Sequence, residues 1–355
     1  MFNIHRLELA RARRRYTAKI LAERAKIAPV TLSRIVNGQQ IPDEETIDKL
    51  VSALGFPRAF FFKDDIDRID VSSASFRSLK AMTARERDAA LSAGSFAYEL
   101  TDWVKARFNL PAADLLDLSY ERNPESAARL LRQHWAIGEK PIGNVVKLLE
   151  TKGVRVFSLA ENTRNVDAFS CWRDDEPYIF LNTFTTPERS RFDAAHELGH
   201  LILHKHGGPR QGRSTESEAH AFAGHFLMPR DDMLAMIPFV TGVAQLLKAK
   251  KRWGVSVSAL AYHLHRLGLI SDWHHRTLCI QINKQFGRSE PDSLSPERSG
   301  VWQMVLRELW KDRMARNHIA DDLAIPEDEL ENLIFGLTGE TGPPENFEKP
   351  HLKSV

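Results

Sequence analysis

The sequence predicts an α+β protein that is mostly helical, with a helical bundle at the N-terminus, a central domain with a small sheet, and a C-terminal helical group. Two observations lead to this fold class. Apolar residues recur every three or four positions through most of the chain, as in amphipathic helices. Alternation typical of strands is confined to three short segments, residues 154–159, 168–172 and 178–182. A length of 355 residues allows two or three domains.

The composition is that of an ordinary globular protein, with 43% hydrophobic and 27% charged residues. The net charge is only +2, but residues 1–40 hold nine Lys or Arg against two Glu, a local excess of seven. Two cysteines, Cys171 and Cys279, are too few for a disulfide framework or a Cys-rich zinc site. Neither a secretion signal nor an apolar run of membrane-spanning length is found, so we expect a cytoplasmic protein without membrane contact.

The first domain is expected at residues 1–62, with helices over 7–15, 18–25, 29–36 and from Pro42 to 54. Thr17 can cap the second helix. Asn37-Gly38 and Gly55 can end the third and fourth, because Asn and Gly accept the left-handed conformation. A helical connector follows at residues 63–123, with a hinge at 64–70 and a candidate capping box at Thr83-Ala-Arg-Glu86.

The N-terminal domain resembles the Xre (lambda/434 repressor-like) helix-turn-helix family in three strings: Arg15-Tyr-Thr-Ala-Lys-Ile-Leu-Ala-Glu-Arg-Ala25, Leu32-Ser-Arg-Ile-Val-Asn-Gly38 and Leu50-Val-Ser-Ala-Leu-Gly-Phe56. The resemblance implies a homodimer on a double-stranded DNA operator, with residues 29–36 as the recognition helix in the major groove. It places base contacts and backbone contacts at Val30, Ser33, Arg34, Thr17, Arg11 and Arg14. Ala18 and Val36 depart from the family, which commonly has Gln and Glu there. The alternative is a helix-turn-helix used for protein contacts, with the basic cluster as a solvated face.

The central chemistry lies in the five residues His196-Glu-Leu-Gly-His200. On a helix, His196 and His200 are one turn apart on the same face, so both imidazoles can reach one metal ion. Glu197 lies beside them and can take a proton from water at an open metal position. This is the zincin arrangement for Zn²⁺, with Glu197 as catalytic base. A structural zinc site is the alternative, but it has no use for a base beside an open position.

The flanks of this motif resemble the ImmA/IrrE-type zinc metallopeptidases over about residues 127–272. The resemblance rests on the Arg-Phe pair before the motif and on Glu216-Ser-Glu-Ala-His-Ala-Phe-Ala-Gly-His-Phe-Leu-Met-Pro229 after it. It implies a peptidase domain, here residues 124–275, and a repressor-type protein as substrate. In zincins the strand before the motif helix is commonly the edge on which a peptide docks, which makes Tyr178 and Phe180 candidates for the substrate edge. A core strand is the alternative.

The third metal ligand has three candidates: His206, Glu216 and Glu218. His206 completes a longer zincin spacing, but that spacing needs a glycine where Leu203 stands. The two glutamates open the next helix roughly 200° apart, so only one can face the metal. We expect Glu216, which also matches the family's ligand, with Glu218 toward solvent or a basic neighbour. His220, one turn after Glu216, is then expected to hydrogen-bond a ligand imidazole, where the family usually has Asn or Asp.

The chain after the peptidase domain is expected to form a C-terminal helical group, residues 276–338, for docking or dimerisation, and a disordered tail, residues 339–355. The sequence as a whole predicts a DNA-binding transcription regulator with a zinc-dependent endopeptidase domain that acts on a repressor, in trans or within its own chain. The alternative is a DNA-binding repressor or antitoxin whose peptidase fold senses or binds a partner, such as a cognate toxin, without proteolysis.

Overall fold

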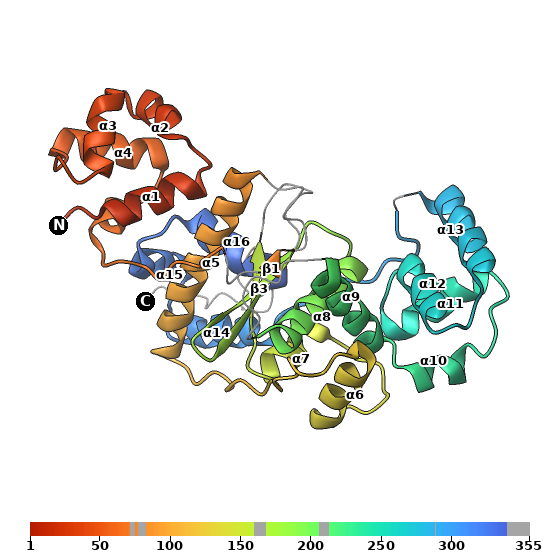
Figure 1. The fold of residues 1–355 in the computed structure, drawn as a ribbon. Helices are drawn as coiled ribbons and strands as arrows, with labels where there is room; N and C mark the ends of the chain where they lie inside the picture. The colour runs from red at the N-terminus through yellow and green to blue at the C-terminus, as the bar shows by residue number, and fades with distance from the viewer. Residues whose placement is uncertain (72–74, 77–82, 160–167, 206–212, 288, 339–355) are drawn as a thin grey trace, which may run out of the picture.

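The computed structural model describes residues 1–71, 75–76, 83–159, 168–205, 213–287 and 289–338. Helices surround one small sheet (Figure 1), so the predicted fold class, α+β and mostly helical, is confirmed. The expected disordered tail, residues 339–355, and the candidate ligand His206 lie outside the described residues. Among the described residues, no helix is both long enough and apolar enough to cross a membrane.

The N-terminal bundle consists of α1 (Ile4–Arg13), α2 (Ala18–Ala25), α3 (Pro29–Val36), α4 (Glu44–Leu54) and the 3-10 turn η1 (Arg58–Phe62). Its helix ends follow the sequence signals. The Thr17 hydroxyl accepts a hydrogen bond from the Ile20 amide at the start of α2. Gly55 ends α4 with φ 68°, a left-handed value that favours glycine. No side chain caps α3, whose first turn begins instead with Pro29.

The connector is built around α5 (Ala84–Lys105), which begins at the predicted capping box. This helix is buried along most of its length between α1 and the sheet (Figure 1). The ring of Phe96 lies 5.8 and 5.9 Å, centroid to centroid, from Phe56 and Phe60 of the bundle. The same apolar cluster continues to Phe157 and Phe180 of the sheet. The bundle and the sheet therefore share one hydrophobic core, with α5 in its middle.

The segment after η1, which we expected to be a hinge, is held on two sides. The Arg6 guanidinium donates from Nε to the carbonyl oxygen of Asp64 over 2.8 Å. Arg173 of the sheet binds Asp67 over 2.6 Å. Ile69 is 7% exposed and packs in the shared core. The hinge prediction is therefore wrong at residues 64–70, because this segment joins the bundle to the rest of the core.

The sheet contains β1 (Ser75–Phe76), β2 (Arg155–Leu159), β3 (Phe169–Arg173) and β4 (Glu176–Asn182), in the order β1-β3-β4-β2. The β3–β4 hairpin is antiparallel, β2 runs parallel to β4, and β1 runs antiparallel to β3. The three longer strands match the predicted segments. The two-residue strand β1 was not predicted, because alternation cannot be recognised in so short a segment.

The position of β4 contradicts the expected substrate edge. This strand is paired on both sides, with β3 and with β2, so its backbone cannot accept a further strand. Tyr178 and Phe180 are both 0% exposed and face the shared core. The alternative prediction of a core strand is therefore the one that the structure supports.

The helices around the central site are α6 (Pro124–His134), α7 (Val145–Thr151), α8 (Pro187–Leu203) and α9 (Arg213–Leu227). Helix α8 follows β4 directly and packs against β3, β4 and α9. Four further helices, one after another, extend this region: α10 (Arg230–Met236), α11 (Val243–Trp253), α12 (Val257–Arg266) and α13 (Asp272–Phe286). The expected domain boundary at residue 275 falls inside α13.

The C-terminal group, α14 (Gly300–Lys311), α15 (Arg316–Leu323) and α16 (Glu327–Thr338), docks within its own chain. Helix α16 packs on β2, and its Gly336 leaves no room for a Cβ beside Ser158 and Thr183. At its other end, Glu329 binds Arg13 of α1. Helix α16 therefore spans from the sheet to the N-terminal bundle.

Candidate metal centre and DNA-facing helix

The metal-binding candidates come together on α8 and α9. His196 and His200 lie one turn apart on α8 and are 1% and 7% exposed. Their Nε2 atoms are 3.1 Å apart. The Glu216 carboxylate of α9 lies 3.3 Å from each of the two nitrogens. All three side chains thus turn a ligand atom toward one point, and they form a group that could hold a metal ion.

The donor set fits zinc. A tetrahedral zinc ion with bonds of about 2.0 to 2.1 Å holds its ligand atoms roughly 3.3 Å apart, close to the separations between these three groups. Burial acts to raise the pKa of Glu216, but hydrogen bonds with His196 and His200 outweigh it and hold the pKa well below its usual range. Glu216 is therefore ionised at neutral pH, as a carboxylate ligand must be.

Glu197 follows the ligand candidate His196 on α8 and is 1% exposed. The hydroxyl of Ser170 on β3 donates to Oε2 of Glu197 over 2.7 Å. This bond ties the carboxylate to the sheet, so the direction of Glu197 is set by β3 as well as by its own helix. Since Ser170 pairs with Ser75 in the sheet, the connector segment lies next to the strand that holds Glu197.

A chain of hydrogen bonds runs from His200 through His204 to Glu218. Nδ1 of His200 lies 3.0 Å from Nδ1 of His204, and Nε2 of His204 lies 3.1 Å from Oε2 of Glu218. If His200 holds a metal through Nε2, its Nδ1 carries a proton and donates to His204, which then donates to Glu218. Carboxylates placed in this way orient ligand imidazoles in metal sites. Glu218 thus faces a basic neighbour, which is one of the two surroundings we expected.

The DNA-facing candidates share one side of α3. Val30 is 58% exposed, and Ser33 and Arg34 are exposed as well, whereas Leu32 and Ile35 are buried on the opposite side. Helix α3 lies at the outer end of the bundle, away from α5 and α16 (Figure 1).

Comparison with known families gives one match for the N-terminal bundle and one for the region of the metal-binding group. Residues 149–265 match the IrrE N-terminal-like domain of peptidase family M78, and residues 5–59 match a helix-turn-helix domain. The chain joins a helix-turn-helix domain to an IrrE-like peptidase domain. The match over residues 149–265 includes α8, α9 and the ligand candidates His196, His200 and Glu216. None of the curated proteins searched matches the chain.

Within the IrrE-like domain, His220 lies one turn after Glu216, as expected. Its ring centroid is 6.4 Å from that of His196, and the two rings meet edge to face. On its other side the ring lies 4.9 Å from Phe192 and 5.4 Å from Tyr262. His220 therefore stands between the metal-binding group and a neighbouring cavity. The proposed hydrogen bond to a ligand imidazole stays a prediction.

Two residues that we expected on DNA phosphates are engaged within the helix-turn-helix protein. Arg14 binds Glu329 of α16 over 2.9 Å and donates to the carbonyl oxygen of Leu54. Arg11 binds Glu8 and the carbonyl oxygen of Tyr16. These contacts engage part of each guanidinium group, and the contacts of both residues with DNA phosphates stay a prediction. Thr17 is half-buried, and its hydroxyl caps α2.

Sequence reasoning missed two residues of the metal centre, Ser170 and His204. His204 carries a signal that could have found it, because it lies four residues after His200 and so on the same helix face. Ser170 carries none, since its contact with Glu197 joins two elements that only the tertiary structure brings together.

Proposed function

We propose that the chain is a DNA-binding regulator whose IrrE-like domain is a zinc-dependent endopeptidase acting on a repressor-type protein. One observation carries the proposal: three ligand atoms converge beside Glu197, a buried carboxylate that Ser170 orients. A metal site with a structural role only has no use for this arrangement.

The residues of the site then have distinct roles. His196, His200 and Glu216 would hold Zn²⁺, which supplies Lewis acidity to the peptide bond when bound. Glu197 takes a proton from the attacking water and passes it to the departing amine, so it acts first as a base and then as an acid. Ser170 keeps the Glu197 carboxylate in one orientation through both transfers.

Metal analysis of the purified full chain tests the site. The parent should bind one zinc per chain, and the double variant His196→Ala, His200→Ala should bind none. Glu197→Gln should keep the zinc and lose cleavage of a repressor-type substrate. Equal zinc in the parent and the double variant would remove the basis of the proposal.

The helix-turn-helix part is proposed to bind a double-stranded DNA operator as a homodimer, because one small module offers few base contacts. The exposed face of Val30, Ser33 and Arg34 on α3 supports this. Gel-shift titrations at low salt against operator and scrambled duplexes test it. Equal affinity for the two duplexes would show that the domain does not read sequence.

Cleavage of another protein is favoured over self-cleavage in the connector. A peptidase needs an extended segment that it can reach, and residues 64–70 are instead packed and hydrogen-bonded. Incubation of the zinc-loaded chain followed by mass mapping of its termini should return an intact chain. New termini between residues 64 and 75 would reverse this assignment.

A second candidate function is a DNA-binding repressor or antitoxin that senses a ligand or binds a toxin without proteolysis. The core shared by the bundle, α5 and the sheet favours it, because occupation of the central site and the position of the bundle are then mechanically linked. The Glu197→Gln variant separates the two functions. Full regulation by this variant in cells would support sensing, and loss of regulation with zinc and DNA binding intact would support proteolysis.

A further inference from the structure

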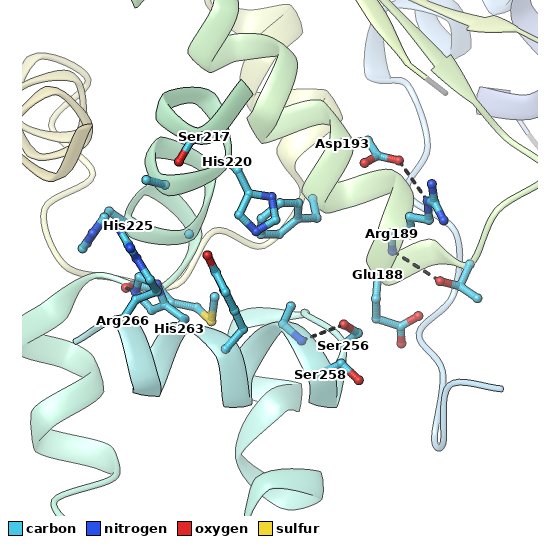
Figure 2. A pocket seen from close by; sticks show the side chains of 17 residues that line it. Glu188, Arg189, Asp193, Ser217, His220, His225, Ser256, Ser258, His263 and Arg266 are labelled. Atoms are coloured by element: carbon cyan, nitrogen blue, oxygen red, sulfur yellow. Dashed lines mark hydrogen bonds and ion pairs between the residues drawn. The ribbon is translucent and has the colours of Figure 1, made fainter. Parts of the chain in front are cut away.

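We infer that the cavity between α8, α9 and α12 is a side-chain pocket that selects a tyrosine of the protein substrate. The cavity has a volume of about 490 Å³, within the range of ligand-binding pockets. Figure 2 shows its lining drawn from these three helices. The inference rests on the proposed endopeptidase function and adds the residue type that the site recognises.

The pocket begins next to the metal-binding group. Ser217, the residue after the ligand candidate Glu216, belongs to its lining, and so does His220, whose ring meets that of His196. A substrate whose carbonyl group lies at the ligand cluster therefore places an adjacent side chain at the mouth of this pocket.

The near walls of the pocket are aromatic. His220 lies between Phe192 of α8 and Tyr262 of α12, with centroid distances of 4.9 and 5.4 Å. Tyr262 is 40% exposed, so its ring has a free surface toward the cavity and solvent. Rings pack favourably against rings at such distances, so these walls favour an aromatic occupant over an aliphatic one.

The far end of the pocket is polar, with two buried histidines beside Arg266. His263 is 4% exposed, and burial lowers its pKa to about 3. Its Nε2 lies 2.9 Å from the carbonyl oxygen of Met228. The ring of His225 stands 4.8 Å from that of His263, and burial lowers its pKa as well. The Nδ1 atom of His225 is buried and has no hydrogen-bond partner among the described residues.

A hydroxyl group fits this end better than other polar groups. It can both donate and accept, so it can bond Nδ1 of a neutral His225 in either tautomer. Arg266 lines the same end, beside His225 and His263 in Figure 2, and forms no ion pair within the described chain. Its guanidinium can donate to a phenolic oxygen. An aromatic ring that ends in a hydroxyl is the side chain of tyrosine.

The acidic residues of the lining are already engaged. The Glu188 carboxylate accepts hydrogen bonds from Ser293 and from the amide of Leu294. Asp193 lies 3.6 Å from Arg189. A lysine side chain in the pocket would therefore meet neutral histidines and Arg266 rather than an available carboxylate.

Peptide hydroxamates test the pocket directly, because they bind zinc whether or not the chain cleaves peptides. Two series carry a residue X on the amino side or on the carboxyl side of the hydroxamate, with X as Tyr, Phe, Leu, Glu or Lys. Titration calorimetry with the zinc-loaded full chain should show one series in which Tyr binds about tenfold more tightly than Leu and roughly fivefold more tightly than Phe.

Variants of the pocket show which residues produce the preference for tyrosine. His225→Phe should bring Tyr and Phe within about twofold of each other, since it removes the partner of the hydroxyl. Ala259→Trp should fill the pocket and remove all discrimination between side chains. His265→Phe, on the same helix but outside the lining, is the control and should keep the preference for Tyr. Equal binding of all five residues in both series, or a preference for Glu or Lys, would overturn the inference.

A metal-independent measurement separates this inference from the zinc proposal. Saturation-transfer NMR with N-acetyl-tyrosinamide should give a signal with the parent and none with Ala259→Trp. If no hydroxamate binds while this signal is present, the zinc proposal fails and the pocket stands. If hydroxamates bind without discrimination and the signal is absent, the pocket fails and the zinc site stands. Absence of both hydroxamate binding and the NMR signal also overturns the pocket.

Discussion

Arg13 and Glu329 form an ion pair between the first and the last described helices, with Nε 2.6 Å from Oε2. The side chains are only 8% and 2% exposed, and Arg14 adds a second bond to the same carboxylate. The basic end of α1 is therefore neutralised by the C-terminal helix of the same chain. A buried pair of this kind costs much when one partner is removed, because the other charge stays in the core.

The Glu329→Gln variant should lower the free energy of unfolding by about 3 kcal/mol, since it removes the buried carboxylate that Arg13 and Arg14 share. Urea denaturation of the full chain measures this loss. Asp328→Asn is the matched control, because Asp328 is 59% exposed and binds Arg14 at the surface. Its effect should stay below about 0.5 kcal/mol. Equal losses in the two variants would show that the buried pair contributes little.

Glu218→Gln should weaken zinc binding roughly 10- to 100-fold, as loss of a carboxylate behind a ligand histidine typically does. The physical reason is the chain from Glu218 through His204 to His200, which sets the orientation of the His200 ring. Competition with a chromogenic chelator measures the affinity. Glu216→Ala should lose zinc entirely. Unchanged zinc affinity in Glu218→Gln would show that the contact between Glu218 and His204 does not help to orient His200.

Arg34→Ala should relax the sequence preference of DNA binding by about 1 to 3 kcal/mol at one base pair, because Arg34 lies exposed on the outer face of α3. Competition gel shifts with operator variants measure this change. Arg14→Ala should lower protein stability, since Arg14 binds α16, and should weaken binding to every sequence alike. Unchanged DNA affinity in Arg14→Ala would remove this residue from the DNA interface.

Acid should destabilise the fold through His263, whose folded pKa of about 3 lies below the ordinary value of 6.5. Between these values the unfolded chain binds a proton that the folded chain does not, so the free energy of unfolding falls by up to about 1.4 kcal/mol per pH unit on acidification. His220, His225 and Arg266 face the ring and oppose its charge.

The His263→Gln variant removes this proton and keeps a donor for the Met228 carbonyl. Urea denaturation between pH 6.5 and 4.5 should then give a shallower slope than in the parent. His265→Gln should keep the parent slope, because His265 lies near the surface beside Asp272. Parallel slopes in the parent and His263→Gln would show that His263 is protonated in the folded chain.

Local signals in the sequence predicted the helix ends and the metal-binding group well. Thr17, Gly55 and the capping box at Thr83 each act within a few residues, so neighbouring residues suffice to predict them. The spacing of His196 and His200 is likewise a property of a single helix. The position of Glu216 near the two histidines followed from the side of α9 on which it lies. That side can be worked out from the order of residues along the helix.

The failed expectations all depend on contacts between distant parts of the chain. The ion pair of Arg14 could not be foreseen either, because its partner Glu329 lies 315 residues away. Strand β4 looked like an edge because the parallel pairing of β2 does not show in local alternation. Residues 64–70 looked like a hinge because their acidic character does not reveal that Arg6 and Arg173 bind them.

The packing of Phe96 against Phe56 and Phe60 has a consequence for any event that severs the helix-turn-helix from the rest of the chain. The released fragment would carry an apolar face that α5 now covers, and exposed patches of this kind lead to aggregation and degradation. Severance would thus lead to the loss of the DNA-binding domain rather than to its release in a folded form. Each molecule could be switched off only once, and recovery of the regulated state would require new synthesis.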